Sequence, residues 1–355
     1  TWHNIVHIMS VMIYMFVYIF FKCNGVHRDL HSFPTRRSSD LYSLVAFKKQ
    51  HLESAVELFL KGYSQERMHS PYLPLRAIKD PDWIRTMLQS KLVHPGVAMV
   101  EDDHLLAYLI TGGLFNWKGQ RAAIVPVYCH GAAKDNKQRL YQKMYQALAR
   151  EWVKEGCHLH LIGHFAHDAL LQETMYQLGF GALVTERLRN CSVLDICQAI
   201  PIQEAQNLSE LVELHMDHIR YYAESPTFLA RSTDWSPALD DLQAHRQNGD
   251  VFFVSYDQSE PCAYLIVGES ATGGEGFLLQ NTKTAQIKSA YVRPDLRGTG
   301  IGAALLNRAI QWSKQQGYER VFVEHETANV AGGNFWSKYF TPYLHFSMRY
   351  IDSTL

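Results

Sequence analysis

The sequence repeats itself after 160 residues. The segment DNKQRLYQKMYQALAREWVK, residues 135–154, aligns with DLRGTGIGAALLNRAIQWSK, residues 295–314, and shares an aspartate, an alanine, a tryptophan and a lysine with it. At the same displacement MYQLGF, residues 175–180, aligns with FWSKYF, residues 335–340. Repetition at a fixed interval indicates that one folding unit is built more than once. A chain of 355 residues is long enough for two such units.

Both halves follow the same order of expected elements. Each begins with a strand and a helix, continues with two strands, and then has a strand rich in β-branched and aromatic residues, AAIVPVYCHG (122–131) or QIKSAYVRP (286–294). The long helix of the repeat, another strand, a short helix and a closing strand complete each half. Helices interleaved with strands predict an α/β fold with a mixed sheet, built twice. We place the two domains at 42–195 and 196–355.

Residues 1–41 differ from the rest of the chain. HSFPTRRSSDL, residues 31–41, is the translation of one reading frame of a common sequencing-adapter oligonucleotide. We therefore interpret residues 1–41 as an assembly artefact or an unrelated segment. The alternative is a membrane anchor in the apolar run 5–21, whose seventeen residues are at the short limit for spanning a bilayer. With this segment excluded, we expect no association with membranes.

The composition gives no support for binding nucleic acid, an anionic membrane or a metal. A net charge of −1 offers no electrostatic case for binding nucleic acid or an anionic membrane. Six cysteines without CxxC pairs predict reduced thiols in a cytoplasmic protein. Four histidines crowd the segment HLHLIGHFAH, residues 158–167, where we expect buried or rim side chains with ordinary partners and no metal.

Three glycines on alternate positions open the long helix of the second half. Gly298, Gly300 and Gly302 lie in VRPDLRGTGIGAALLNRAI, residues 292–310, although glycine costs a helix about 1 kcal/mol relative to alanine. The N-terminus of a helix attracts anions through its unpaired N–H groups, and glycine lets the backbone touch the ligand. A phosphate is therefore expected over residues 297–303. The spacing is neither that of a nucleotide-hydrolysing P-loop nor that of the GxGxxG dinucleotide fingerprint.

The run Arg297-Gly298-Thr299-Gly300-Ile301-Gly302, after its strand and before its helix, resembles the [RQ]xxGx[GA] loop of the GNAT superfamily of N-acetyltransferases. The likeness covers 199–355 well and 42–195 in outline. It implies two tandem GNAT-like domains, each a mixed, mostly antiparallel sheet flanked by helices. It also implies a coenzyme site for acetyl-coenzyme A, whose pyrophosphate is held by the loop and Ala303 and whose pantetheine meets backbone amides near Tyr291 and Val292 and the side chain of Asn329.

The first half lacks the features of this loop. At the repeat displacement Arg297 aligns with Lys137, Gly300 with Leu140 and Gly302 with Gln142. Side chains at these positions are expected to fill the space that a pyrophosphate needs. We therefore interpret 42–195 as a degenerate GNAT-like domain that serves as a structural partner.

Acetyl transfer to an amine needs a proton acceptor. Glu324 and Glu326 in VEHETAN share one face of a strand by the period-two rule, with His325 opposite, and either carboxylate is a candidate base. Many family members carry a tyrosine acid at the position of Trp336, and an indole is not a useful acid. Tyr339, three residues later on the same helical face, is the substitute, or the thiolate leaves unassisted.

The resulting hypothesis is an acetyl-coenzyme-A-dependent N-acetyltransferase that acts on a primary amine of a small molecule or on an amino terminus. The alternative, motivated by Trp336, is an acyl-coenzyme-A-binding regulatory module with little or no transferase activity. Transfer to a hydroxyl is also compatible with the motif.

Overall fold

The computed structural model describes residues 42–196, 200–230, 234–270, 276–280 and 282–355. The segment interpreted as adapter-derived, 1–41, lies outside these residues. Contacts within the chain divide it into two compact units. The N-terminal unit comprises the described residues up to Thr185 together with Pro342–Leu355, and the C-terminal unit comprises Glu186–Thr341.

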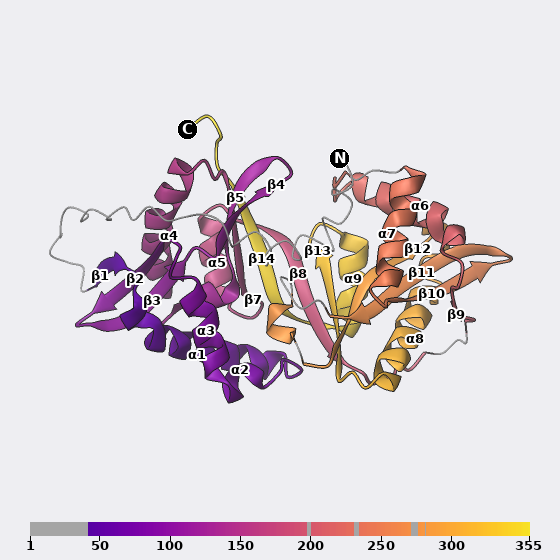
Figure 1. Ribbon diagram of the computed structural model, residues 1–355, viewed down its shortest axis with the longest axis horizontal. Coiled ribbons are helices and arrows are strands. Elements are labelled where there is room, and N and C mark those ends of the chain that lie inside the picture. The colour runs from indigo at the N-terminus through magenta and orange to yellow at the C-terminus, as the bar shows by residue number, and fades with distance from the viewer. Residues whose placement is uncertain (1–41, 197–199, 231–233, 271–275, 281) are drawn as a thin grey trace. The chain divides into compact units, whose positions relative to one another are not determined.

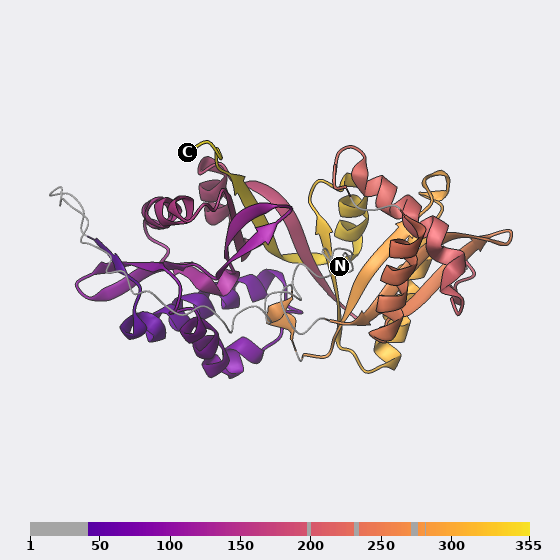
Figure 2. The same ribbon diagram turned by 45° about the horizontal axis from the view of Figure 1, so that its top comes forward.

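One part of the N-terminal unit is a four-stranded antiparallel sheet. Its strand order is β1-β2-β3-β6, with bounds Ser43–Ala46, Gly96–Glu101, His104–Ile110 and His130–Ala132. Helices α1 (Leu52–His69) and α4 (Lys137–Lys154) lie on opposite sides of it (Figures 1 and 2). Helices α2 (Arg76–Lys79) and α3 (Pro81–Ser90) contact α1.

The rest of the N-terminal unit is built on a mixed group of strands. The order is β4-β5-β7-β14 and then the first half of β8, with bounds Gly113–Trp117, Gln120–Val125, Leu159–Phe165, Thr341–Tyr350 and Gly181–Asn190. Strands β5 and β7 run parallel, whereas β4 with β5 and β7 with β14 run antiparallel. Helix α5 (Ala169–Gln177) packs against α4.

The segment AAIVPVYCHG is not the single strand that the sequence suggested. It forms β5, which ends at Val125, and β6, which begins at His130, with a 3-10 turn at Val127–Cys129 between them. Pro126 precedes the turn and has no N–H for a strand ladder, so the chain bends there. Strand β5 pairs with β7 and β6 pairs with β3.

The C-terminal unit contains one mixed sheet. Its order is the second half of β8, then β13, β12, β11, β10 and β9, the last five with bounds Arg320–Glu326, Thr284–Val292, Glu260–Glu269, Val251–Asp257 and Gln203–Glu204. All neighbours from β12 to β9 run antiparallel, and β12 with β13 runs parallel. The strand expected at the start of this half is only the two-residue β9. Helix α9 (Val330–Tyr339) follows β13.

Alternating side chains divide the C-terminal core into two layers. Phe253 and Leu265 pack with the buried face of α8 (Ile301–Gln315), whereas Phe252 and Tyr264 pack with α6 (Val212–Ala223) and α7 (Trp235–Gln247). Successive strand residues point to opposite faces of a sheet, so β10 and β11 are apolar on both faces. The two layers are visible in Figures 1 and 2, with α6 and α7 on one face and α8 on the other.

The units do not coincide with the ranges expected from the repeat. The strand expected to close the second half, β14, pairs with β7 over Leu344–Tyr350 and belongs to the N-terminal unit. His164 on β7 and Ser347 on β14 are joined by a hydrogen bond of 3.1 Å. Residues 186–190 of β8, expected to close the first half, belong to the C-terminal unit, next to β13. Strand β14 therefore completes the N-terminal unit, and β8 is divided between the two units after Thr185.

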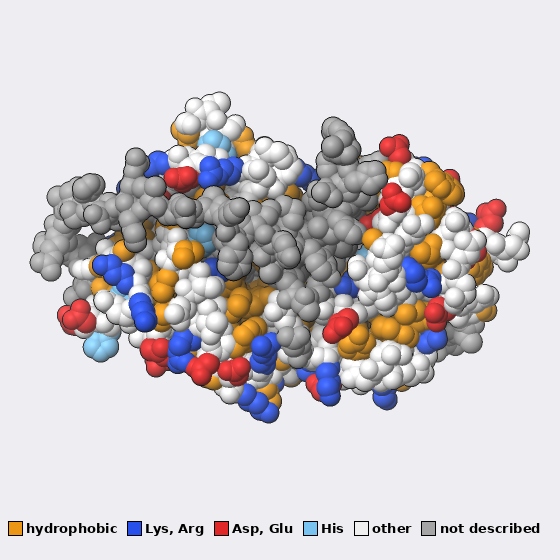
Figure 3. Space-filling view, in the orientation of Figure 1, with side chains coloured by type: hydrophobic (Ala, Val, Ile, Leu, Met, Phe, Trp, Pro, Cys, Tyr) orange, Lys and Arg blue, Asp and Glu red, His pale blue; other side chains and the backbone are white. Residues whose placement is uncertain are grey.

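The described surface carries both signs of charge. On the face drawn in Figure 3, basic and acidic side chains are interspersed. No helix in the described part of the chain combines the length and the hydropathy needed to cross a bilayer. The cysteines at 129, 157, 191 and 262 are free, buried thiols.

Candidate active site

A cleft of about 500 Å³ opens in the C-terminal unit. Its walls come from α6, α7, β11, β12, the glycine loop, the start of α8, β13 and α9. Most of the residues singled out in the sequence line it, namely Tyr291, Val292, Arg297, Gly298, Gly300, Gly302, Ala303, Glu324, Glu326, Asn329 and Tyr339. Thr299 and Ile301 lie between lining residues of the loop. Tertiary folding therefore brings the predicted coenzyme loop and the predicted carboxylates to one cavity.

The cleft exists because two parallel strands separate. Strands β12 and β13 are paired only from Thr284 with Arg320 to Ile287 with Val323. The register of β12 with β11 shifts at the next residue, so Lys288 is an extra, bulged residue on β12. A bulge bends the strand that carries it, and here it turns the second half of β12 away from β13. The two strands therefore splay beyond Ile287 and Val323.

Separation leaves backbone amides of β12 at an open edge. The N–H of Arg293 donates to the carbonyl of Cys262 on β11, at 3.0 Å. Successive N–H groups of a strand point to opposite edges, so the N–H of Tyr291 also points to β11, whereas that of Val292 points to the edge left by β13. The Val292 carbonyl, on the same edge, accepts a hydrogen bond of 3.1 Å from Arg297 Nε.

The glycine loop uses conformations that suit glycine. Gly298 and Gly300 have φ of +82° and +95°, in the left-handed region. Gly300 is the N-cap of α8 and no side chain caps this helix end. A Cβ on Gly298 has no atom within 4 Å, so the protein itself leaves that space open. The first N–H groups of α8 are therefore presented to the cleft with room for an anion.

Charged and aromatic side chains hold the loop in place. Arg293 pairs with Asp257 at 2.7 Å and with Asp295 at 2.8 Å. The guanidinium of Arg297 lies over the ring of Tyr221, 4.7 Å from its centroid, and is exposed. An exposed guanidinium beside a helix N-terminus adds positive potential where the glycine backbone is most accessible.

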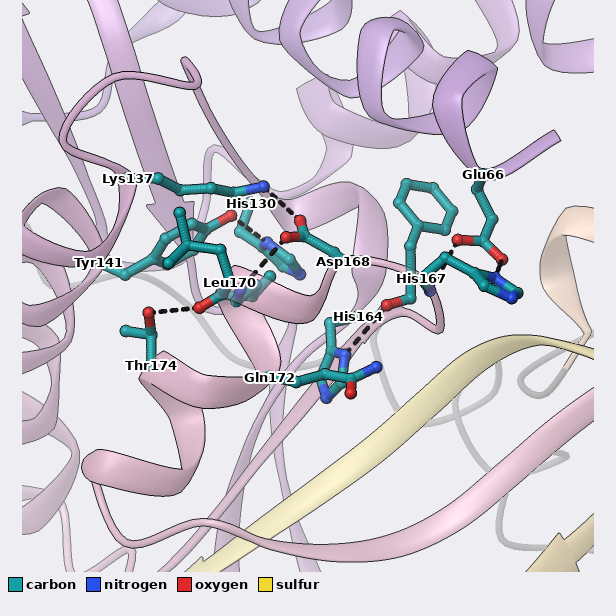
Figure 4. Close-up of polar contacts among 12 residues, drawn as sticks. Glu66, His130, Lys137, Tyr141, His164, His167, Asp168, Leu170, Gln172 and Thr174 are labelled. Atoms are coloured by element: carbon teal, nitrogen blue, oxygen red, sulfur yellow. Dashed lines mark hydrogen bonds and ion pairs between the residues drawn. The ribbon is translucent and has the colours of Figure 1, made fainter. Parts of the chain in front are cut away.

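The corresponding part of the N-terminal unit lacks the glycine loop. Helix α4 begins at Lys137, one turn earlier than the position that aligns with the start of α8. Leu140 is 1% exposed and packs in the core. The ammonium of Lys137 forms an ion pair with the carboxylate of Asp168 (Figure 4). A turn of helix thus stands where the C-terminal unit has its glycine loop. The sequence led us to expect that side chains would fill the space for a pyrophosphate, and in the structure the helix backbone differs there as well.

The two predicted carboxylates reach the cleft from β13. Glu326 is buried, Glu324 is half-buried, and both line the cavity. His325 between them has both ring nitrogens engaged. Arg187 Nε donates to His325 Nε2 at 3.0 Å, and His325 Nδ1 is 3.0 Å from the Glu326 carbonyl. Burial, with a smaller contribution from the Arg187 charge, lowers the pKa of His325.

Two aromatic residues of α9 stand in different environments. Trp336 is 7% exposed and contacts the rings of Phe335 and Phe340 in the core. Tyr339, the last residue of α9, is half-buried and lines the cleft. Trp336 therefore packs in the core while it also lines the cleft, and Tyr339 is the more exposed of the two.

Asn329 has a structural task at the start of α9. Its Oδ1 accepts from the backbone N–H of Gly332 at 2.9 Å and from the hydroxyl of Tyr221 at 2.8 Å. This is an N-cap, which satisfies a helix donor that has no partner within the helix. The same residue lines the cleft, so its cap places it beside the expected pantetheine path.

A polar chain in the same cleft was not anticipated from the sequence. Asp241 Oδ2 is 3.0 Å from His215 Nε2, and the hydroxyl of Tyr264 is 2.9 Å from His215 Nδ1 and 2.7 Å from His218 Nδ1. Ser289 Oγ is 3.1 Å from the same hydroxyl. Histidines three residues apart on a helix share a face, which was a detectable signal. Their partners lie on α7, β11 and β12 and are brought near only by folding.

The histidines of the N-terminal unit have conventional partners. His130 contacts the hydroxyl of Tyr141 and the carbonyl of Gly163, each at 2.7 Å, and His167 Nδ1 is 2.8 Å from the buried Glu66 (Figure 4). His160 Nδ1 is 2.8 Å from the hydroxyl of Tyr145. Among the described residues, no three side chains of histidine, cysteine, aspartate or glutamate form a group that could hold a metal.

Residues 214–340 match the model of the Acetyltransferase (GNAT) family. Streptothricin acetyltransferase A of Bacillus subtilis (strain 168) is 31% identical over 108 residues, which are 30% of this chain and 60% of that protein. The uncharacterized N-acetyltransferase MJ1207 of Methanocaldococcus jannaschii is 31% identical over 72 residues, which are 20% of this chain and 30% of that protein. The chain thus spans less than two thirds of either relative.

A solved structure shows the same fold over most of the chain. The GCN5-related N-acetyltransferase from Sphaerobacter thermophilus superposes with a TM-score of 0.53 and 14% identity, over 88% of this chain and 96% of that one.

Proposed function

We propose that the C-terminal unit, whose residues 214–340 match the model of the Acetyltransferase (GNAT) family, is a GNAT acetyltransferase that transfers an acetyl group from acetyl-coenzyme A to a primary amine. The observation that carries the proposal is the start of α8, where uncapped N–H groups and two left-handed glycines face the cleft. A diphosphate is the ligand that such a backbone recognises best. We propose two tandem GNAT-like domains, of which only the second binds the coenzyme.

The residues present fit the coenzyme. Segment 297–303, from Arg297 to Ala303, provides N–H donors, an adjacent guanidinium and no Cβ at Gly298 or Gly300. We propose that Thr299, Ile301 and Gly302 contribute their backbone to the same grip. The open edge of β12 and the capped Asn329 then guide the pantetheine toward the carboxylates. When bound, the coenzyme supplies the thioester from which the acetyl group is transferred.

The chain performs three tasks at the thioester. The N–H of Val292, oriented by the β12 ladder, donates to the acetyl carbonyl and stabilises the negative charge that develops there. Tyr291 supports this position through its ring, which lines the cleft. Glu326 and Glu324 attract the ammonium form of the amine and accept its proton, directly or through water. Tyr339 protonates the thiolate.

The cleft favours an amine of modest size. Three carboxylates line it, those of Asp241, Glu324 and Glu326, together with the rings of Tyr221 and Tyr222. Carboxylates and tyrosine faces both attract a cationic group. The relative named for streptothricin is similar over part of this domain, which supports a small-molecule substrate over an amino terminus.

A second candidate function is a regulatory module that binds acyl-coenzyme A and transfers little or nothing. The buried, core-packed Trp336 at the position of the usual tyrosine acid favours it. Release of free thiol in the presence of a panel of primary amines separates the two functions. Tight coenzyme binding without turnover on any amine supports the module.

The coenzyme site is tested by a matched pair of variants. Gly298 and Gly317 both have φ of +82° and no atom within 4 Å of a built Cβ, so alanine imposes the same backbone strain at each. Only Gly298 faces the proposed diphosphate. In calorimetry with acetyl-coenzyme A, Gly298→Ala and Gly300→Leu are expected to weaken binding about tenfold or more, roughly 1.4 kcal/mol. Gly317→Ala is expected to bind like the unmodified chain, and equal affinities for all of them contradict the proposal.

A further inference from the structure

With Asp241 ionised and His215 neutral, the chain of hydrogen bonds from Asp241 to His218 has one consistent arrangement of protons. An ionised carboxylate only accepts, so His215 donates to Asp241 from Nε2–H. A neutral His215 then has its lone pair on Nδ1 and accepts from the hydroxyl of Tyr264. The single hydrogen of Tyr264 is thereby used, so its oxygen accepts from His218 Nδ1–H. A neutral His218 carries its lone pair on Nε2, the position of a base.

Burial makes this arrangement rigid. Tyr264 is fully buried and His215 is 4% exposed, whereas His218 is half-buried at the wall of the cleft. Ser289 Oγ lies 3.1 Å from the Tyr264 hydroxyl and 3.3 Å from His218 Nδ1. The inner members of the chain therefore hold the outer imidazole in one orientation and one tautomer.

His218 stands next to the proposed acetyl site. Its ring is stacked on that of Tyr291, with 5.1 Å between centroids and 25° between planes. Tyr291 directly precedes Val292, whose N–H is at the open edge of β12. The imidazole thus lies on the α6 side of the strand segment proposed to polarise the carbonyl.

Amide formation from an ammonium ion releases two protons from nitrogen. One must leave before the nitrogen can attack, and one leaves as the amide forms. The carboxylates of β13 account for one acceptor. We propose, on the premise of the proposed function, that His218 is a catalytic residue that accepts the other proton at Nε2, and that Tyr264, His215 and Asp241 are its positioning residues.

The step balances without any further reagent. His218 Nε2 takes a proton from the nitrogen while the N–C bond forms, and the C–S bond of the thioester breaks. The thiolate receives one proton from Tyr339 or from water. His218 passes its Nδ1 proton to Tyr264, whose own proton moves to His215, so the positive charge comes to rest beside the Asp241 carboxylate. Reversal of this transfer, with release of the Nε2 proton to solvent, restores the starting state.

Other titratable groups near His218 set the charge that it experiences. Besides His215, Tyr264 and Asp241, these include Asp217 and Tyr222 on α6 and Tyr291 on β12, and the charges of Arg297 and Glu224 act on the Tyr291 ring that His218 stacks on. A base acts in its neutral form, so kcat/KM rises with pH as His218 loses its proton.

The first test replaces the base and keeps its hydrogen bond. In His218→Gln the side-chain amide can still donate to Tyr264 but cannot accept a proton. With acetyl-coenzyme A and an amine that the whole chain acetylates, kcat is expected to fall about 100-fold, while coenzyme affinity by calorimetry is unchanged. His104→Gln, an exposed site in the N-terminal unit, is the matched control and is expected to retain full activity.

The second test distinguishes loss of the proton acceptor from loss of the folded structure. His218→Ala leaves a space at the cleft wall, and added imidazole is expected to restore at least a tenth of the lost rate. Tyr264→Phe removes the hydroxyl that links His218 to His215. It is expected to shift the rising limb of the pH profile of kcat/KM and to lower kcat about tenfold. Thermal unfolding of each variant reports whether the fold is retained.

The outcomes are distinguishable. Absence of acetyl transfer by the unmodified chain on every amine overturns the proposed function and this assignment with it. Transfer that persists at the unmodified kcat in His218→Gln, with an unchanged pH profile, overturns the assignment and leaves the proposed function standing. A loss of rate in His218→Ala that imidazole does not restore, with intact folding and coenzyme binding, also overturns the assignment.

Discussion

At the scale of single residues, burial of histidines governs how the N-terminal unit responds to acid. Burial lowers the pKa of His130 and of His160 to about 4, from an ordinary value near 6.5. The unfolded chain therefore binds more protons than the folded chain between these values. Stability conferred by the neutral imidazoles is present above pH 6.5 and is lost as the pH falls toward 4. Each histidine is expected to contribute a slope of up to about 1.4 kcal/mol per pH unit.

Urea unfolding between pH 4.5 and 8 measures this dependence. His130→Asn is expected to be less stable overall and to show a slope smaller by about one proton, because the titrating group is gone. His104→Gln, at an exposed position, is expected to leave the slope unchanged. Equal slopes in the unmodified chain and His130→Asn would show that the imidazole is not kept neutral by the fold.

The two carboxylates of β13 can be ranked by substitution. Glu326→Gln and Glu324→Gln keep the size and polarity of the side chains but cannot accept a proton at pH 7. The variant at the residue that receives the ammonium proton is expected to have a kcat lowered about 100-fold or more. The kcat of the other variant is expected to fall much less. Steady-state kinetics with acetyl-coenzyme A and an amine gives the answer. Full activity in both variants, and in the double variant, would remove β13 from the reaction.

At the scale of elements, Asp168 connects two helices of the N-terminal unit. Its carboxylate caps α5 by accepting from the N–H of Leu171 at 3.1 Å, and it pairs with Lys137 at the start of α4 (Figure 4). Asp168→Ala removes both interactions and is expected to lower the unfolding free energy by about 1–2 kcal/mol. Asp168→Asn keeps the cap and removes only the ion pair, so it is expected to cost less than about 1 kcal/mol. A thermal or chemical unfolding series that finds equal losses would contradict the assignment of the cap.

At the scale of the whole molecule, the last strand of the chain, β14, completes the N-terminal unit. Strand β14 pairs with β7 over seven residues and buries Tyr343 and Leu344. A chain that ends at Thr341 lacks this inner strand, so its N-terminal unit is expected to lose protection against hydrogen exchange in β7 and α4. A chain that ends at Tyr350 lacks only residues 351–355 and is expected to keep full protection. Unchanged protection after the longer truncation would mean that residues 42–185 fold without β14.

The amino-acid sequence alone was sufficient to predict the α/β class, the glycine loop and the likeness to GNAT acetyltransferases, because these depend on local patterns. Spacing of apolar residues predicts helices and strands, and Gly298 and Gly300 need left-handed backbone that few other residues adopt. The sequence also pointed to Glu324, Glu326 and Tyr339, which the fold brings to one cleft.

Only the tertiary structure decided the rest. The placement of β14 beside β7 depends on pairing between strands more than 150 residues apart, for which local propensity has no preference. The start of α4 at Lys137, with the buried Leu140 in its first turn, is not marked by a sequence motif. The chain of hydrogen bonds from Asp241 to His218 joins α7, α6 and β11. Hydrogen bonds among residues distant in sequence form only when the folded backbone fixes their separation.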